Sequence, residues 1–235
     1  MLDLLISEPF LGFSKKSFDF LSKLKNKRYN NKVWFDKNRE IYEDFIKSPM
    51  RSLLDNLSTE LKKIDGSIVV SPKSIFRINR DIRFKKDKTP YKFNYSAAIT
   101  YDRIKTPEIP QFYFHISPDE FLFAAGQYST DNNLINKIRR NLIRNEDKFL
   151  SIIHKIDFVK SFGKVNGESL VNVPLEYRSN TDLLEETKLL IKMKQIYVFK
   201  TYSPDVCLSH ELMNLILKNI SITNEFNKFL YDSIK

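Results

Sequence analysis

The side chains best suited to chemistry gather in one short stretch of the chain. It begins at Arg77 and ends at Tyr91, and it reads Arg-Ile-Asn-Arg-Asp-Ile-Arg-Phe-Lys-Lys-Asp-Lys-Thr-Pro-Tyr. Between residues 71 and 92, eight Lys or Arg stand against two Asp, a local net charge of +6. Guanidiniums held close together repel one another unless an anion lies among them, and their planar forks match phosphate and carboxylate groups. The stretch therefore predicts recognition of a small phosphate- or carboxylate-bearing ligand.

Each residue type in this stretch has an expected role. The candidate ligand-binding residues are Arg77, Arg80, Arg83, Lys88, Tyr91 and, from a second group of arginines, Arg139. The arginines would clamp an oxyanion, the lysine would add a point charge and the tyrosine a hydroxyl. Asp81 would orient the guanidiniums or act as an acid or base, and His115 is a tentative second catalytic residue. Phosphoester-type chemistry is compatible with this set, but no residue establishes catalysis, so enzymatic activity stays open.

Two other interpretations of the cluster stay open. In the first, the protein is a structural or interaction protein whose arginines form a salt-bridge network that ties a loop to the sheet. In the second, it is a nucleic-acid-binding module. This is less favoured, because 28 of the 39 basic residues are Lys and are spread along the chain, so the net charge of +10 is a general bias. His115, a lone histidine in an aromatic strand, is more typical of a packed or solvent-facing residue than of a general base.

Composition and missing motifs exclude several classes of protein. The five glycines leave no room for a Gly-rich phosphate loop, and no H-E-x-x-H or C-x-x-C occurs. One cysteine, Cys207, excludes an internal disulfide and any multi-cysteine metal site and favours a reducing cytoplasm. We therefore expect no metal and no cofactor. No apolar run reaches the ~18 residues of a membrane span, so we expect a soluble protein with no membrane partner. No feature indicates an oligomeric state.

The N-terminal region predicts helices that lead into the cluster. Apolar residues recur at helical spacing between residues 50 and 64, with Ser48-Pro49 as N-cap and first residue and Gly66 after the end. Asp36 is expected to cap a preceding helix that runs to about Lys47, and a further helix is expected around residues 18–24.

The middle of the chain predicts strands, and the rest predicts helices again. Short apolar-aromatic runs cover residues 68–70, 74–79, 91–101, 111–117 and 120–125, and residues 195–202 form a later one. Ser117-Pro118-Asp119-Glu120 is the expected hairpin turn. Helices are expected after Thr130 or Asp131, from Asn180-Thr181 to Leu190, and from Ser209 onward. The order predicts a single α+β domain over residues 1–235, in which a mainly antiparallel sheet (about 70–125) is flanked by N-terminal and C-terminal helices.

The spacing within the cluster also resembles a family signature. The string R-x-x-R-D-x-R-F-x-x-D-K-x-P-Y is similar to that of a bacterial family of conserved hypothetical proteins, the domain-of-unknown-function family 2461. Flanking features fit as well: Asn30-Asn31, Trp34-Phe35, Pro72-Lys73 and Tyr113-Phe-His115-Ile-Ser-Pro118. The resemblance spans nearly the whole chain and implies no reaction. The family tends to have glycines after the His-x-x-Pro turn and a glycine triplet after the next strand, where this chain has Asp119-Glu120 and Ala124-Ala125-Gly126. This chain therefore departs from the family pattern at both positions.

Overall fold

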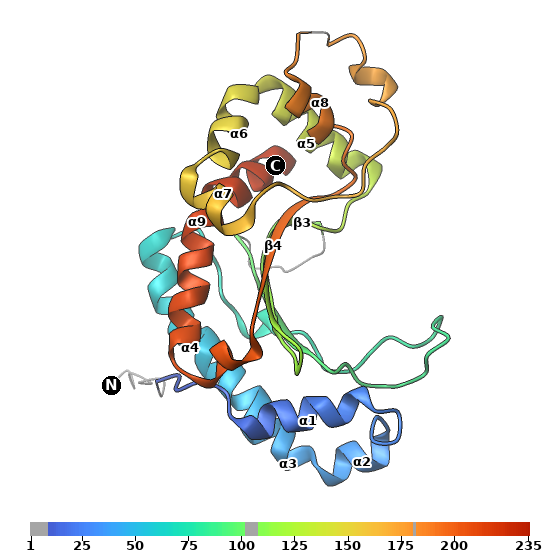
Figure 1. Ribbon diagram of the computed structural model, residues 1–235, viewed down its shortest axis with the longest axis vertical. Helices are drawn as coiled ribbons and strands as arrows, with labels where there is room; N and C mark the ends of the chain where they lie inside the picture. The colour runs from blue at the N-terminus through green and yellow to red at the C-terminus, as the bar shows by residue number, and fades with distance from the viewer. Residues whose placement is uncertain (1–8, 102–107, 181) are drawn as a thin grey trace. The chain divides into compact units, whose positions relative to one another are not determined.

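The fold is known from a computed structural model that describes residues 9–101, 108–180 and 182–235 (Figure 1). Contacts between residues divide the chain into two compact units. Unit 1 comprises Met1–Ile99, Tyr113–Phe123 and Thr201–Lys218, and unit 2 comprises Thr100–Phe112, Ala124–Lys200 and Asn219–Lys235. That the whole chain unfolds as one domain stays a prediction.

One sheet of four antiparallel strands confirms the α+β class, and it packs against N-terminal and C-terminal helices. The strands follow the sheet order β1-β2-β3-β4 and are Tyr95–Ile99, Gln111–Ile116, Phe121–Gln127 and Ile196–Tyr202. Side chains of β2 alternate between buried and half-buried, as expected for a strand with one face on the core. The predicted turn between β2 and β3 is confirmed, since the Ser117 N–H donates to the Glu120 carbonyl at 3.0 Å.

The strands predicted at residues 68–70 and 74–79 are wrong, because these residues form isolated bridges only, and the 91–101 strand shortens to β1. Ile75 bridges Ala97 and Asn79 bridges Tyr91. Residues 75 and 79 are four positions apart, whereas their partners 97 and 91 are six positions apart. The segment 91–97 therefore holds two extra residues, which interrupt the ladder. Segment 75–80 therefore runs antiparallel to residues 90–97 without forming a regular strand.

The N-terminal helices belong to unit 1 and differ from the prediction in how they join. They are α1 (Lys15–Lys25), α2 (Lys32–Lys37), α3 (Arg39–Tyr42), a π-helical turn η1 (Glu43–Lys47) and α4 (Ser48–Ile64). Ser48 has helical backbone angles (φ −63°, ψ −50°), so the prediction that it caps α4 is wrong, and α3 runs through η1 into α4. Asp36 is likewise not a cap, because it lies inside α2 and pairs with Arg39.

Pro49 gives a physical reason for this π-helical turn. An α-helix would have the N–H of residue 49 donate to the carbonyl of Phe45, and proline has no N–H. The Ser17 hydroxyl donates to that carbonyl instead, at 2.5 Å. Beyond the turn, the predicted apolar stripe of α4 is confirmed for Met50, Leu53, Leu54, Leu57 and Leu61, which are buried, whereas Ile64 at the end of the helix is exposed.

Unit 2 holds the second group of helices. They are α5 (Asn132–Arg144), α6 (Glu146–Ile153), α7 (Ile156–Phe162), α8 (Glu185–Leu190) and residues 219–234 of α9 (Glu211–Ile234). Asp131 caps α5 as predicted, accepting from the Leu134 N–H at 2.7 Å. The helix predicted from Asn180-Thr181 begins only at Glu185, and Thr181 lies outside the described residues. Phe149 of α6 packs on Phe229 of α9, with ring centroids 4.9 Å apart.

Short 3-10 turns complete the fold: η2 (Pro72–Ser74), η3 (Leu175–Tyr177) and η4 (Pro204–Leu208). Within the described ranges, no helix combines the length and the apolar character that a membrane crossing needs.

Candidate functional site

The arginine-rich segment is a long loop of unit 1 whose two arms pair at the base (Figure 1). The Arg80 N–H donates to the Pro90 carbonyl at 2.8 Å, and the Lys92 N–H donates to the Ile78 carbonyl at 2.9 Å. Asn30 fastens this base to the end of α1. Its amide group donates to the carbonyls of Leu24 and Tyr91 at 2.6 and 2.9 Å, and its oxygen accepts from the Tyr91 N–H at 3.0 Å. Asn30 is itself buried, so these bonds form inside the core.

Tyr91 stabilises the base of the loop by the packing of its ring. The ring stacks on Phe35 with centroids 4.1 Å apart and planes 14° apart, and the residue is buried. Burial raises the pKa of its hydroxyl. The geometry therefore makes Tyr91 an anchor of the loop, whereas the sequence suggested that its hydroxyl would bind a ligand.

Arg80 is bonded to several groups of the loop at once. Its Nη1 donates to Asp87 Oδ2 at 2.6 Å, to the Thr89 carbonyl at 3.1 Å and to the Thr89 hydroxyl. The hydrogen bond from Arg80, followed by that from the Thr89 N–H, lowers the pKa of Asp87 to about 2. Nε and Nη2 of Arg80 have no hydrogen-bond partner among the residues that the structure describes. One edge of the guanidinium is thus used by the loop, and the other edge is free.

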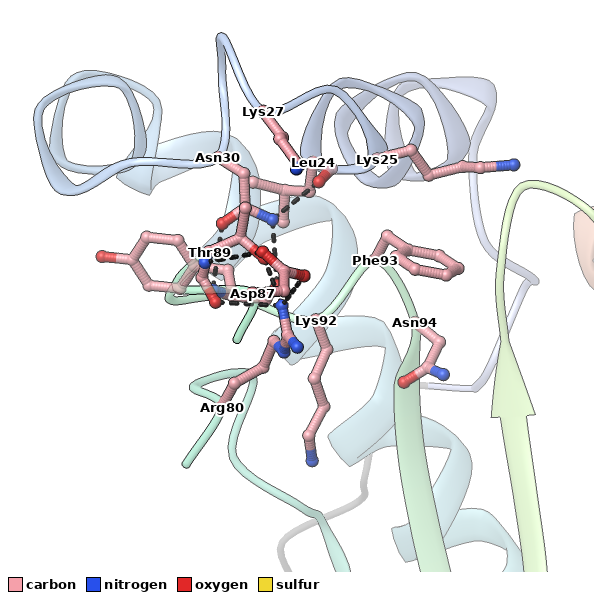
Figure 2. A pocket seen from close by; sticks show the side chains of 11 residues that line it. Leu24, Lys25, Lys27, Asn30, Arg80, Asp87, Thr89, Lys92, Phe93 and Asn94 are labelled. Atoms are coloured by element: carbon pink, nitrogen blue, oxygen red, sulfur yellow. Dashed lines mark hydrogen bonds and ion pairs between the residues drawn. The ribbon is translucent and has the colours of Figure 1, made fainter. Parts of the chain in front are cut away.

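A hollow of about 270 Å³ opens beside Arg80 (Figure 2). Its charged lining consists of four cations and one acid: Lys25, Lys27, Arg80, Lys92 and Asp87. Lys25 is paired with Asp119 at 2.8 Å. Lys27 and Lys92 have no acidic partner within the described part of the chain. Figure 2 shows the Arg80 guanidinium against Asp87 and Thr89, with the Lys92 side chain beside it and its ammonium pointing away from those bonds.

Lys92 is unusual because it is half-buried and still lacks an acid. Burial, and then the positive charge of Arg77, lowers the pKa of its ammonium. The Lys92 ammonium lies 5.5 Å from the ring centroid of Phe76. Arg77 itself is exposed and forms no hydrogen bond or ion pair with any described residue.

The tip of the loop holds the remaining predicted residues in short-range contacts. Arg83 donates from Nε to Asp81 Oδ1 at 3.0 Å and from Nη2 to Asp81 Oδ2 at 2.7 Å, and both side chains are exposed. These bonds lower the pKa of Asp81. The Lys88 ammonium donates to the Ile82 carbonyl at 3.0 Å. The tip is thus a self-contained turn, and it presents its unused charge to solvent.

Arg139 belongs to α5 in unit 2, whereas the arginine-rich loop belongs to unit 1. It is 5% exposed and donates to Asn136 Oδ1 at 2.9 Å and to the Met193 carbonyl at 3.0 Å. Burial lowers the pKa of its guanidinium. These contacts tie α5 to the turn before β4, which is a structural role.

His115 lies on the half-buried face of β2, in unit 1, between two polar partners. Its Nδ1 lies 3.2 Å from the Tyr113 hydroxyl and its Nε2 lies 3.5 Å from Glu120 Oε1. Burial lowers the pKa of the imidazole, and the nearby carboxylate of Glu120 opposes this effect. A neutral imidazole with its proton on Nε2 satisfies both contacts, donating to Glu120 and accepting from Tyr113.

Several lining residues of the hollow were not predicted as site residues. Asn30 was noticed only as part of the family resemblance, although a buried asparagine that bonds two segments is what holds the loop. Thr89 and Lys92 flank Pro90-Tyr91 in the sequence. As polar residues beside the predicted ligand residue Tyr91, they could have been predicted to line the site. Lys27 comes from the turn after α1, and no sequence pattern connects it to the loop.

The last glycine of Ala124-Ala125-Gly126 has a role in strand packing. Gly126 has φ +126°, and a Cβ atom there would lie 2.4 Å from the carbonyl oxygen of Ile196 in β4. Only glycine permits this approach of two backbones. Within unit 2, the glycine therefore lets β3 and β4 pair closely.

Comparison with known proteins gives one result. A family model described as "Conserved hypothetical protein (DUF2461)" matches residues 16–229. No match was found among curated proteins. The matched residues include the whole arginine-rich loop and all four strands, so the chain belongs to the DUF2461 family of conserved hypothetical proteins.

Proposed function

We propose that the hollow beside Arg80 binds a small ligand that carries a phosphate or a carboxylate. The observation that carries the proposal is the free edge of the Arg80 guanidinium. Asp87 and Thr89 bond only to Nη1, which holds the plane of the group in place. Nε and Nη2 then offer two parallel N–H donors, the arrangement that grips an oxyanion through two hydrogen bonds.

The charges around the hollow support an anion rather than a cation. Asp87 is ionised at neutral pH, since its pKa is lowered to about 2, but its charge is already balanced by Arg80. Lys27 and Lys92 add positive charge that no acid of the described chain balances. An anion would reduce the mutual repulsion of these cations and would meet donors that are already in place.

The proposal concerns recognition and not a reaction. Asp81 is engaged by Arg83 at the tip, and His115 belongs to a separate set of contacts on β2. The two tentative catalytic residues are therefore bonded to different partners, and no shared reacting position is defined between them.

The test is a thermal-shift and calorimetric screen with inorganic phosphate, nucleoside monophosphates and small dicarboxylates. Wild type is expected to gain stability with at least one of these anions. Arg80→Lys keeps a cation beside Asp87 but lacks the fork, so it should weaken binding roughly tenfold. Arg83→Lys is the matched control at the tip and should leave affinity unchanged. A screen in which no anion stabilises wild type, or in which both variants lose binding equally, would contradict the proposal.

A further inference from the structure

The tip of the arginine-rich loop exposes an aromatic ring among cations. Phe84 is 93% exposed, and its neighbours Arg83, Lys85 and Lys86 are exposed as well. Among the described residues, the ring has one close charged neighbour, the Arg83 guanidinium at 5.8 Å from the ring centroid. A single exposed ring is common on protein surfaces. What distinguishes this ring is the charge that surrounds it.

The acids of the loop do not balance that charge. Asp81 is occupied by Arg83 and Asp87 by Arg80. Lys85 and Lys86 are exposed, and neither forms an ion pair with a described residue. The tip combines an accessible ring with uncompensated positive charge, and these two features fit a partner that has both flat rings and negative charge.

A second exposed ring lies at the hollow. Phe93 lines the hollow, is 43% exposed, and has the Lys25 ammonium 5.7 Å from its ring centroid. Figure 2 shows Phe93 between Lys25 and Asn94, with Arg80 and Asp87 nearby. Arg80, Asp87 and Thr89 belong both to the loop and to the lining, so the loop that carries Phe84 also forms part of the hollow. The surface of the loop and the hollow therefore holds two exposed rings, each with a cation beside it.

We propose that this surface binds single-stranded nucleic acid. A backbone phosphate occupies the hollow at the free edge of Arg80, bases stack on Phe84 and Phe93, and Lys85 and Lys86 contact neighbouring phosphates. This inference rests on the proposed anion site, because the phosphate in the hollow is one of the strand's own. Alternating cations and exposed aromatic rings are how proteins hold single strands without reading their sequence.

A single strand fits better than a duplex or a membrane. The bases of a duplex are already stacked on one another, so they offer no free face to a protruding ring. An anionic membrane would use the same cations, but binding at its interface draws on a broad apolar face. Here only Phe84 stands at the tip, and the second ring lies in the wall of the hollow.

The test is fluorescence anisotropy with labelled oligo-dT and oligo-rU of about 12 nucleotides, within the usual site size of such surfaces. Phe84→Ala should weaken binding roughly tenfold, since stacking on one ring contributes that much. Tyr128→Ala is the matched control, because Tyr128 is also an exposed aromatic residue (71%) but belongs to unit 2. It should bind as wild type does.

The charges are tested through salt dependence. Replacing Lys85 and Lys86 together by Gln should reduce the slope of log affinity against log salt by about 1.4, since each phosphate contact on a single strand contributes about 0.7. Replacing Lys62 and Lys63 by Gln removes the same charge from the exposed end of α4 and is the control. Equal slopes for the two double variants would overturn the inference.

The outcomes separate this inference from the proposed function. If inorganic phosphate binds at Arg80 but the oligonucleotides bind no more tightly than phosphate does, the inference is wrong and the anion site stands. If Phe84→Ala loses oligonucleotide binding and keeps the phosphate-induced thermal shift, both are supported. Equal affinity for a duplex of the same length, or binding to phosphatidylserine vesicles without oligonucleotide binding, would overturn the inference. If no anion of the screen binds and no oligonucleotide binds, both proposals fail.

Discussion

The base and the tip of the arginine-rich loop are built in opposite ways, although they are only a few residues apart. At the base, Asn30, Phe35 and Tyr91 join three segments of unit 1 by buried hydrogen bonds and a stacked ring pair. At the tip, Arg83 bonds to a residue two positions away, and both partners are exposed. Clustered charge in a sequence therefore has two different uses here. One part fixes a guanidinium in a defined orientation, and the other part remains available to a partner.

The largest loss of stability is expected for a substitution of Tyr91 at the base. Tyr91→Ala removes the ring that stacks on Phe35 and should lower the free energy of unfolding by about 3–5 kcal/mol, as for other large-to-small changes in a core. Tyr91→Phe keeps the ring and should change stability by less than about 1 kcal/mol. Urea unfolding of both variants measures this. A strong loss in Tyr91→Phe would mean that the hydroxyl, and not the ring, holds the base.

Arg80 should show an intermediate effect, because its ion pair is only partly shielded from water. Arg80→Ala removes the hydrogen bonds to Asp87 and Thr89 and should cost about 1–2 kcal/mol of stability. A loss of 3–5 kcal/mol is typical of breaking a buried ion pair. That larger value, measured by urea unfolding, would place Arg80 in a buried network and would undercut the free edge on which the anion site depends.

The pH dependence of stability should report the same pair. The pKa of Asp87 is about 2 in the folded protein, against an ordinary value of 3.8. A carboxyl whose pKa is lower in the folded state stabilises the fold above the unfolded value, and that stabilisation is lost as the pH falls from about 4 towards 2. Asp87→Asn should therefore flatten the acid limb of a plot of melting temperature against pH. The matched variant at the tip is Asp81→Asn. If it flattened the curve more than Asp87→Asn did, the contrast between base and tip would be wrong.

The smallest effect is expected at Arg83. Its ion pair with Asp81 is exposed, and exposed pairs contribute little to stability. Arg83→Ala should leave the free energy of unfolding nearly unchanged, which chemical denaturation can check. A clear loss of stability would show that the tip is part of the folded core of unit 1.

The sequence predicted the type of most elements because their signals are local. The apolar stripe of α4, the Asp131 cap and the Ser117–Glu120 turn each depend on residues within one or two turns of chain. The strand at 74–79 failed for the opposite reason. Its apolar residues suit a strand, but two extra residues on the facing arm break the ladder, and a register of this kind is set by tertiary pairing.

The same limit applies to the candidate site. The sequence marked Arg80 but could not show that only one edge of it is used, because that depends on Asp87 and Thr89 folding back over it. It also named Arg139 as a ligand-binding residue, and it could not show that this side chain donates to Asn136 and Met193 within unit 2. It also missed Lys27 and Lys92, since isolated lysines carry little information in a lysine-rich chain.

The π-helical turn at residues 43–47 changes the direction in which side chains point before and after it within one continuous helix. Each α-helical residue turns the side-chain direction by about 100°, and a π-turn holds one residue more than an α-turn does. Tyr42, before the turn, can thus direct its hydroxyl to that of Tyr95 at 3.3 Å, while the leucines of α4 after the turn keep their own buried stripe. Loss of a single residue from this turn would rotate the two faces against each other by about 100°, although no apolar side chain need disappear. The spacing of residues here is therefore as much a part of the core as their identity.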